Sequence, residues 1–400
     1  MLGQPLLFGV GAADEDQSLR GLPVRDPNPK FGLMPRQRIR AMIDHKMIMS
    51  TVPIEDSQLQ PASLDLRLGA RAYRVRASFL PGQDKSVAAR IAQLGGEEIS
   101  LENGAIFEQN CVYVVELMEH LKLPQDIAAV SNPKSSTGRI DVFTRLITDG
   151  SDSFDTISKG YQGKLYAEVS PRSFSIKVRK GTKLNQIRFR LMNSQQGMFQ
   201  DFEINDKELR RRHGESQLVD DGEPTLRRGL ILRVGLSHGD SPDGVIGYRA
   251  QKFAGIIDLE NIGRYKVEDF WEAIRARPDG QLTLDPHHFY ILASSERLHI
   301  PQDVAAEMEP IDPTMGEFRV HYAGFFDPGF GYSANGHLGS RAVLEVRSHE
   351  VPFVLEDKQI IGRLVFYHLS ETPDQLYGQG KTSNYQGQGL KLSKHFAQPA

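Results

Sequence analysis

The segment Leu121-Lys-Leu-Pro-Gln-Asp-Ile-Ala-Ala129 recurs with few changes as Leu298-His-Ile-Pro-Gln-Asp-Val-Ala-Ala306. The offset between the two segments also takes Gln186-Ile-Arg-Phe189 to Arg363-Leu-Val-Phe366. The two halves correspond at this one offset, without a net gap, from residue 121 to residue 189, and such a match is hard to obtain by chance. Because the repeat is far longer than the ~20–50-residue periods of solenoids, it predicts two similar domains in tandem.

Short alternating segments indicate what these domains contain. Apolar and polar residues alternate over 63–68 and over 174–179, which is typical of half-buried strands. Gly and Pro separate such segments, for example at Pro81-Gly82 and Asn132-Pro133. We therefore expect a mainly β fold of two tandem β-barrel or jelly-roll domains with a few short helices. Helices are expected at about 35–47 and 267–277, with Trp271 in the core.

The expected domain boundaries follow from composition. We predict an N-terminal extension at 1–32, a first domain at 33–205, a charged linker at 206–225, a second domain at 226–370 and a C-terminal flap at 371–400. The Arg210-Arg-Arg212 run in the linker is expected to be a solvated face.

Composition excludes several classes of function. The net charge of −3 gives no electrostatic case for nucleic acid or an acidic membrane, and no apolar run approaches the ~18 residues of a membrane span. Cys111 is the single cysteine, so a disulfide within the chain and zinc sites built on paired cysteines are impossible. We expect a cytoplasmic protein. His287-His288, the only adjacent His pair, is expected to be a polar loop rather than a metal site.

Two segments are candidates for binding a nucleotide. Lys134-Ser-Ser-Thr-Gly-Arg139 places three hydroxyl groups between two cations, a pattern that binds phosphate but also suits a polar turn. The segment 321–330 contains Asp327-Pro-Gly, either a simple turn or a carboxylate that accepts a hydrogen bond from a sugar hydroxyl.

Two further features could supply chemistry. Glu168 and Glu345 each lie in an otherwise apolar segment, so each either faces outward by alternation or is a buried carboxylate with a raised pKa, suited to acid–base catalysis. The Gly-rich segment from Tyr377 onward is either a disordered tail or a flap that closes over an anionic ligand.

Together these motifs resemble the dCTP deaminases, zinc-independent members of the trimeric dUTPase superfamily. The resemblance rests on Gln58-Leu-Gln-Pro-Ala-Ser-Leu-Asp-Leu-Arg-Leu-Gly69, the Ser135-Ser136-x-x-Arg139 loop, the segment 321–330 and Ser383-Asn-Tyr-Gln-Gly-Gln388. It implies dUTPase-like domains and hydrolysis of dCTP to dUTP and ammonia, in which a carboxylate activates water for attack on C4 of cytosine. It also implies magnesium bound through the triphosphate, with no direct protein ligand and no zinc.

The resemblance assigns roles by position. Glu345 or Glu168 is the expected general base, with Ser135 and Arg139 also catalytic. The expected nucleotide contacts are Lys134, Ser135, Ser136, Arg139, Ala323, Gly324, Asp327, Tyr377, Lys381, Asn384 and Gln388.

Each half departs from the family pattern in a different place. Ser158 replaces the sugar-binding Asp in the first half, whereas Asp312-Pro-Thr-Met-Gly-Glu317 replaces the phosphate loop in the second. We therefore expect a composite site, in which the first half holds the phosphates and the second supplies Ala323, Asp327 and Glu345. The rival is Glu168 acting among first halves only.

Other functions stay open on the sequence. The alternatives are a dUTP pyrophosphatase, a bifunctional deaminase and pyrophosphatase, and a non-catalytic nucleotide-binding regulator. A homo-oligomer is expected, because two-domain chains cannot individually complete a ring of three domains.

Overall fold

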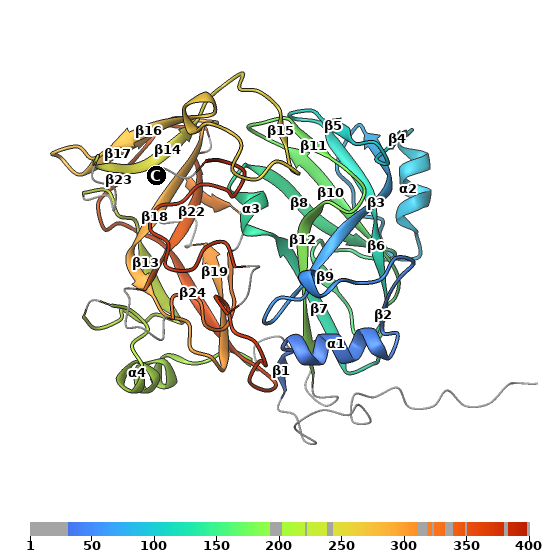
Figure 1. Cartoon of the computed structure of the whole chain (residues 1–400), viewed down its shortest axis with the longest axis horizontal. Coiled ribbons are helices and arrows are strands. Elements are labelled where there is room, and N and C mark those ends of the chain that lie inside the picture. Colours follow the sequence, from blue (N-terminus) through green and yellow to red (C-terminus); the bar gives the residue numbers. More distant parts are fainter. Residues whose placement is uncertain are drawn as a thin grey trace, which may run out of the picture.

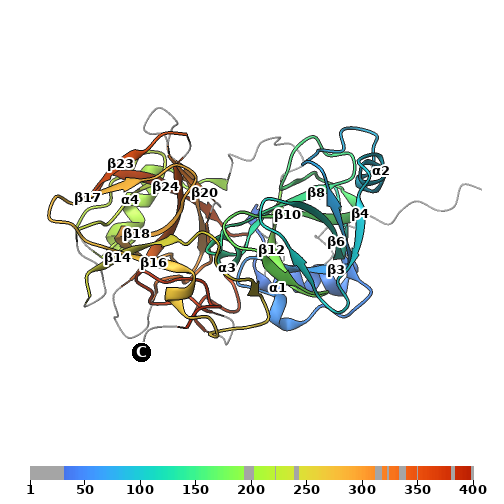
Figure 2. The ribbon, with the colours of Figure 1, turned by 90° about the horizontal axis from the view of Figure 1, so that it is seen from above.

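A computed structural model of the chain describes residues 31–192, 202–220, 222–237, 243–310, 318–321, 324–332, 339–348, 350–379 and 383–397, with the backbone alone at 310 and 318–321. Two lobes lie side by side, the first half of the chain in one and the second half in the other (Figures 1 and 2). Strands dominate both lobes, so the predicted mainly β fold is confirmed.

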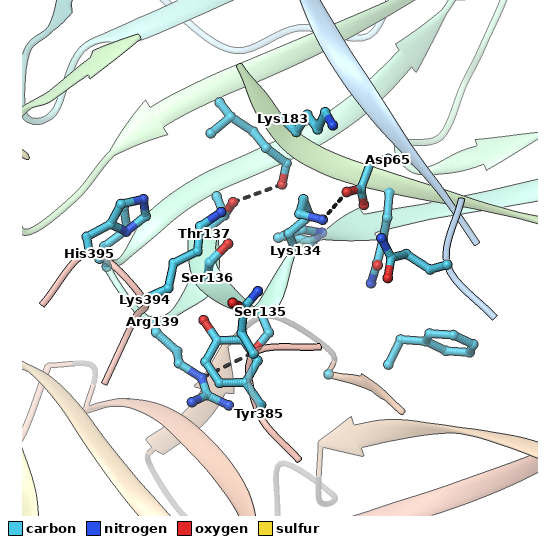
Figure 3. Close-up of a pocket in the computed structure, with 18 of the residues that line it drawn as sticks. Asp65, Lys134, Ser135, Ser136, Thr137, Arg139, Lys183, Tyr385, Lys394 and His395 are labelled. Atoms are coloured by element: carbon cyan, nitrogen blue, oxygen red, sulfur yellow. Dashed lines mark hydrogen bonds and ion pairs between the residues drawn. The ribbon is translucent and has the colours of Figure 1, made fainter. Parts of the chain in front are cut away.

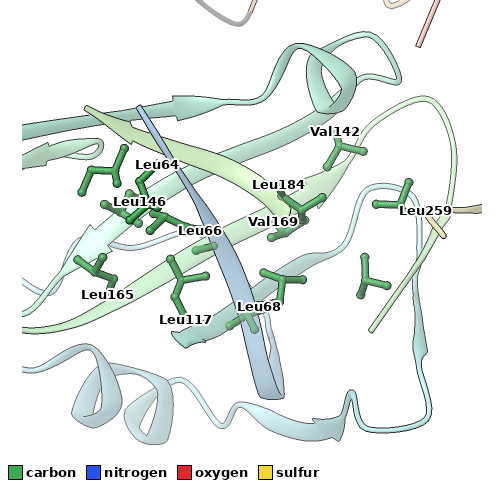
Figure 4. Close-up of a cluster of buried hydrophobic side chains, with 14 of the residues drawn as sticks. Leu64, Leu66, Leu68, Leu117, Val142, Leu146, Leu165, Val169, Leu184 and Leu259 are labelled. Carbon is green, nitrogen blue, oxygen red and sulfur yellow. The ribbon is translucent and has the colours of Figure 1, made fainter. Parts of the chain in front are cut away.

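The first half contains helices α1 (Arg36–Asp44), α2 (Val87–Gln93) and α3 (Ser135–Gly138), the 3-10 helix η2 (Asp56–Gln58), and strands β1 (Gly32–Leu33), β2 (Ile48–Ser50), β3 (Leu64–Val75), β4 (Glu97–Ser100), β5 (Ala105–Phe107), β6 (Val112–Lys122), β7 (Ile127–Pro133), β8 (Val142–Thr148), β9 (Thr156–Ile157), β10 (Gln162–Pro171), β11 (Ile176–Val178) and β12 (Lys183–Leu191). Its main sheet runs β8-β10-β6-β3-β12-β7-β9. This sheet curls around a core of leucines and valines from its strands, and Leu259 of the second half joins them (Figure 4).

The second half contains helix α4 (Asp206–Glu215), the 3-10 helix η4 (Val267–Asp269), and strands β13 (Leu230–Arg233), β14 (Val245–Ala250), β15 (Ile257–Asp258), β16 (Trp271–Arg275), β17 (Gln281–Leu284), β18 (Phe289–Leu298), β19 (Val304–Pro310), β20 (Phe318–His321), β21 (Phe325–Phe326), β22 (Ser340–Ser348), β23 (Phe353–Glu356) and β24 (Ile360–His368). Strands β7 and β12 recur 177 residues later as β19 and β24, and both pairs are antiparallel. Strands β6 and β10 correspond in the same way to β18 and β22.

The two halves share a continuous core. Strand β15 of the second half adds to the sheet of β11 and β5 in the first. Trp271 and Phe396 belong to the same hydrophobic cluster as the first-half leucines, and both rings contact each other edge to face. Because apolar residues of both halves are buried in one core, the two lobes are held against each other. This core therefore sets the geometry of the junction between the lobes.

Of three local expectations, two are confirmed and one is wrong. The helix at 35–47 is confirmed as α1, but the helix expected at 267–277 is wrong, because only η4 is helical and Trp271–Arg275 forms strand β16 against β14. Phe270, Trp271 and Ile274 have helical spacing, yet pairing with β14 and packing of Trp271 on Phe174 decide the local structure. The prediction that Trp271 is a core residue is confirmed.

The segment 206–225 is more than a loose linker. Helix α4 begins at an Asn205 N-cap, whose side chain accepts a hydrogen bond from Glu208 N. Leu209 and Leu218 are buried in the second core. Arg210 and Arg211 are exposed, as predicted, and Arg211 forms an ion pair with Glu208. The Arg212 side chain is only 14% exposed and pairs with Glu208 and Asp303, so the prediction of a solvated face is wrong for this residue.

The alternating residues of β3 are not half-buried, which corrects a further expectation. Asp65 and Arg67 are only 3% and 5% exposed, nearly as buried as the leucines between them. Arg67 donates to the buried Glu119, and Asp65 forms an ion pair with Lys134. Both faces of β3 are therefore enclosed over residues 64–68, and Asp65 faces the candidate site.

Candidate active site

A pocket opens at the junction of the two lobes. Helix α3 of the first half lies beside β22 of the second half there (Figure 1). The volume of the pocket is about 490 Å³, within the range of pockets that hold small-molecule ligands. Both halves and the C-terminal segment line it. Ten of the predicted site residues line this pocket: Lys134, Ser135, Ser136, Arg139, Gly324, Asp327, Glu345, Tyr377, Asn384 and Gln388.

The loop from Lys134 to Arg139 forms one tight helical turn. The carbonyl oxygen of Lys134 accepts hydrogen bonds from the N–H groups of Thr137 (2.8 Å) and Gly138 (3.0 Å). Thr137 Oγ1 donates to the carbonyl oxygen of Leu184 at 3.0 Å, which attaches the turn to β12. Ser135 remains exposed toward the pocket, as Figure 3 shows. The arrangement leaves hydroxyl groups available to phosphate oxygens.

Arg139 joins the loop to the C-terminal segment. Its guanidinium donates to Ser135 Oγ (3.1 Å), Gln388 Oε1 (3.0 Å) and the carbonyl oxygen of Lys391 (2.7 Å). The group also stacks on the Tyr385 ring, 3.9 Å from its centroid. Arg139 is therefore committed largely to holding the site together.

Glu345 enters the pocket from β22 and meets the loop of the other half. A Cβ atom placed on Gly138 would lie 2.8 Å from Glu345 Oε1, so glycine is what allows this approach. Burial raises the pKa of Glu345 well above its ordinary value; the Arg139 guanidinium opposes the rise and the Asp141 carboxylate adds to it. The carboxyl group makes no hydrogen bond to the described residues, so its oxygens are open to a ligand or water.

Asp327 also connects the halves. Its Oδ1 accepts a hydrogen bond from the backbone N–H of Ala62 at 3.1 Å. Burial raises the pKa of Asp327 to about 7, although the Ala62 N–H opposes the rise. The loss of hydration on burial accounts for this direction.

The C-terminal segment closes one side of the pocket. Gln388 Nε2 donates to the carbonyl oxygen of Arg341 (3.0 Å) in the second half, while Ser393 Oγ donates to that of Ser136 (2.8 Å) in the first. Gln386 holds the turn after Asp327 by donating to the carbonyl oxygen of Gly329 (3.1 Å). Over 383–397 the segment is thus a packed part of the site, not a loose tail.

Glu168 lies outside this pocket. Its Oε1 is bound by Arg145, through Nη2 at 2.7 Å and Nε at 3.2 Å, and the carboxylate is almost completely buried. Arg145 itself stacks on Phe154. Glu168 is therefore held by a cation from the neighbouring strand β8.

Some predicted features lie outside the described residues. They are Ala323, Lys381, the acidic segment 312–317 and the side chain of His321. Within the described ranges, no group of three or more His, Cys, Asp or Glu side chains could hold a metal ion. No helix in that part of the chain has the length and apolar character needed to cross a membrane.

Several pocket residues were not singled out from the sequence. Asp65, Lys183, Tyr385 and Lys394 line the pocket close to the loop (Figure 3). Asp65 lies within the motif Gln58–Gly69, and a carboxylate on an alternating strand is the one signal that could have identified it. Lys183 and Lys394 have no sequence signal of their own.

Known proteins of one family resemble this chain over most of its length. Family models described as the 2′-deoxycytidine 5′-triphosphate deaminase N-terminal and C-terminal domains match residues 30–195 and 205–396. A solved structure of 2′-deoxycytidine 5′-triphosphate deaminase from Agrobacterium tumefaciens is 49% identical, with a TM-score of 0.80, and the match covers 86% of this chain and 99% of that one. The chain belongs to the dCTP deaminase family. The predicted resemblance is thereby confirmed.

Curated relatives of this dCTP deaminase family member give shorter matches. A protein of Kocuria rhizophila named "dCTP deaminase, dUMP-forming" is 32% identical over 118 residues, which are 29% of this chain and 58% of the relative. A protein of Sulfurihydrogenibium sp. with the same name is 27% identical over 143 residues, 35% of this chain and 73% of the relative. The chain thus spans less than two thirds of the first relative and about three quarters of the second.

Proposed function

We propose that this protein hydrolyses the 4-amino group of dCTP, with Glu345 as the general base. The observation that carries the proposal is a buried carboxyl group of raised pKa, which lies in a pocket against a loop of hydroxyl groups and cations from the other half. A base whose pKa is raised toward the working pH accepts a proton from water more readily than an ordinary carboxylate.

The chemistry needs only water, the nucleotide and one proton acceptor. Glu345 takes a proton from water while the water oxygen bonds to C4 of the cytosine. The proton passes from Glu345 to N3. The proton of the new C4 hydroxyl group is then transferred to the amino group, the C4–N bond breaks and ammonia leaves, which gives the C4=O and N3–H groups of uracil. Ser135, exposed in the pocket beside Arg139, suits the task of positioning the water.

The rest of the pocket divides the nucleotide between the halves. Ser135, Ser136 and Lys134 are proposed to bind phosphate oxygens, and Asp327 to accept a hydrogen bond from the sugar. Tyr377 packs on Phe330, 5.6 Å between ring centroids, and so covers the turn that carries Asp327. Asn384 and Gln388 complete the enclosure from the C-terminal segment.

Magnesium is proposed to enter with the triphosphate. Asp65 Oδ1 is a buried pocket oxygen without a hydrogen-bond partner, which fits a cation held mainly by phosphate oxygens. Bound in this way, the ion would neutralise phosphate charge, and Lys134 and Asp65 would orient the complex.

The products distinguish this reaction from its nearest alternative. Deamination alone gives dUTP and ammonia, whereas a bifunctional enzyme would give dUMP, pyrophosphate and ammonia. The names of the curated relatives, "dUMP-forming", favour the second candidate.

The test is to incubate the full-length protein with dCTP and magnesium and to measure ammonia and nucleotide products together. Ammonia with dUTP supports the proposal, and ammonia with dUMP supports the bifunctional enzyme. Tight dCTP binding without ammonia would overturn both and support a nucleotide-binding regulator. Glu345→Gln is expected to abolish ammonia release while retaining dCTP binding.

A further inference from the structure

A buried ion pair crosses the junction directly beside Glu345. Arg347 lies two residues after Glu345 on β22, so alternation places both side chains on the same face of the sheet. The Arg347 guanidinium binds the Asp141 carboxylate of the first half, where the Asp141 side chain is 1% exposed. Arg347 Nη1 also donates to the carbonyl oxygen of His287 at 2.6 Å.

Asp141 is rigidly attached to the phosphate loop. Its N–H donates to the carbonyl oxygen of Gly138 (2.8 Å), and its own carbonyl oxygen accepts from Arg172 N (2.9 Å). Its Oδ2 accepts from Ser173 Oγ at 2.6 Å. The residue has φ of 55°, a left-handed conformation that aspartate tolerates better than most residues.

We propose that Asp141 and Arg347 are a positioning pair, which holds the strand of Glu345 against the phosphate loop and cancels a negative charge that would otherwise face the general base. This inference rests on the proposed function of Glu345. It concerns residues that do not touch the reacting atoms.

The effect of the Asp141–Arg347 pair on the charge of Glu345 depends on the groups around this carboxylate. Arg139 and Asp141 face it from the loop, and Tyr385 faces it from the C-terminal segment. Its register neighbours are Ile291 on β18 and His321 on β20. Asp141 disfavours the charged form of Glu345, so an arginine that neutralises Asp141 favours the ionised base.

The pair is specific to the half that bears the proposed base. At the offset of 177 residues, the position of Arg347 is Ser170 in the first half, and Glu168 there is paired with Arg145 instead. Since buried ion pairs often stabilise a protein no better than apolar residues of similar volume, mere attachment of the halves would not require charges here.

The test compares the pH dependence of kcat/KM for dCTP in wild type, Arg347→Met and Asp141→Asn. Arg347→Met removes the guanidinium that binds Asp141 and is expected to move the acidic limb to higher pH by about one unit. Asp141→Asn leaves the Arg347 charge unopposed and is expected to move the limb to lower pH. Titration of the substrate is common to all variants and cancels in the comparison.

The opposite directions separate this role from a structural one. A purely structural pair would lower activity in both variants without moving the acidic limb of the pH profile, or would move this limb in the same direction in both. Either result overturns the inference. Arg233→Met, which breaks an ion pair with Glu296 away from the pocket, is the matched control and should leave the profile unchanged. If Arg347→Met fails to fold, the downward shift in Asp141→Asn still decides the question.

Failure of the proposed function is distinguishable. A wild-type protein that releases no ammonia from dCTP overturns the deaminase proposal, and this inference with it. An active wild type with unmoved variants overturns only the positioning pair.

Discussion

Glu168 and Glu345 occupy equivalent positions on β10 and β22, and both side chains are almost completely buried, yet their surroundings differ. Glu168 is bound by Arg145 from the adjacent strand, whereas Glu345 meets the backbone of the Gly138 turn and has no carboxylate-bound cation among the described residues. The two glutamates lie on equivalent strands, but among the described residues only Glu168 has a cation bound to its carboxylate. The Glu168 carboxylate is occupied by an ion pair, whereas the Glu345 carboxylate in the pocket is left to a ligand or water.

Replacing each glutamate by glutamine gives the largest expected difference in activity. Glu345→Gln is expected to lower kcat by about 10²–10⁴-fold, because a general base is lost. Glu168→Gln is expected to change kcat little, since Glu168 lies outside the pocket. Ammonia release from dCTP measures both. A dead Glu168→Gln beside an active Glu345→Gln would reverse the comparison and support a site formed among first halves.

Removing the cation that binds Glu168 tests what this ion pair contributes to the stability of the protein. Arg145→Met leaves a buried carboxylate unpaired and is expected to lower the free energy of unfolding by about 3–5 kcal/mol. Chemical denaturation measures the change. The double variant Arg145→Met/Glu168→Gln should recover much of the loss; no recovery would show that Arg145 acts mainly through its packing on Phe154.

Asp327 contrasts with Ser158, its counterpart in the first half, because only Asp327 titrates. Its folded pKa of about 7 exceeds the unfolded value near 3.8, so the folded state holds the extra proton between these values. Stability from this group is therefore present at low pH and lost as pH rises through 7, by up to about 4 kcal/mol. Asp327→Asn should be the more stable protein at pH 8, with the advantage shrinking toward pH 4. Thermal melts across this range measure the trend, and a pH-independent gap would contradict it.

Gly138→Ala gives a smaller effect by crowding Glu345 without removing it. The added methyl group meets the carboxylate at 2.8 Å, so Glu345 must shift, and kcat is expected to fall by about tenfold. Gly214→Ala is the matched control, because nothing lies within 4 Å of a Cβ there. Equal kcat in the two variants would show that Glu345 tolerates displacement.

The sequence predicted much of this arrangement because its patterns are local. Alternation and Gly/Pro punctuation predicted a mainly β fold, and the loop 134–139, Asp327 and Glu345 do line one pocket. What could not be predicted depends on contacts between distant segments. Trp271–Arg275 has helical spacing but forms a strand because β14 lies beside it.

Ion pairs between distant segments could not be predicted from the sequence either. Register alone pairs Glu168 with Arg145 across β10 and β8, and no spacing in the sequence indicates that pairing. Asp65 follows an alternation that predicts exposure, but the loop from the neighbouring strand β7 encloses it through Lys134. Asp65 and Glu345 are two buried charged strand residues that line the pocket, whereas the equally buried Glu168 lies outside it.

The position of strand β15 shows that the two halves of the repeat are not independent domains. It lies in the second half of the sequence but completes a sheet of the first, and Phe396 at the far end of the chain fills the first core. A chain cut between the halves would therefore leave one fragment with an open sheet edge and an incomplete interior. Whatever their similarity, the halves are not interchangeable modules, because they share a sheet and a core and the pocket lies where they meet.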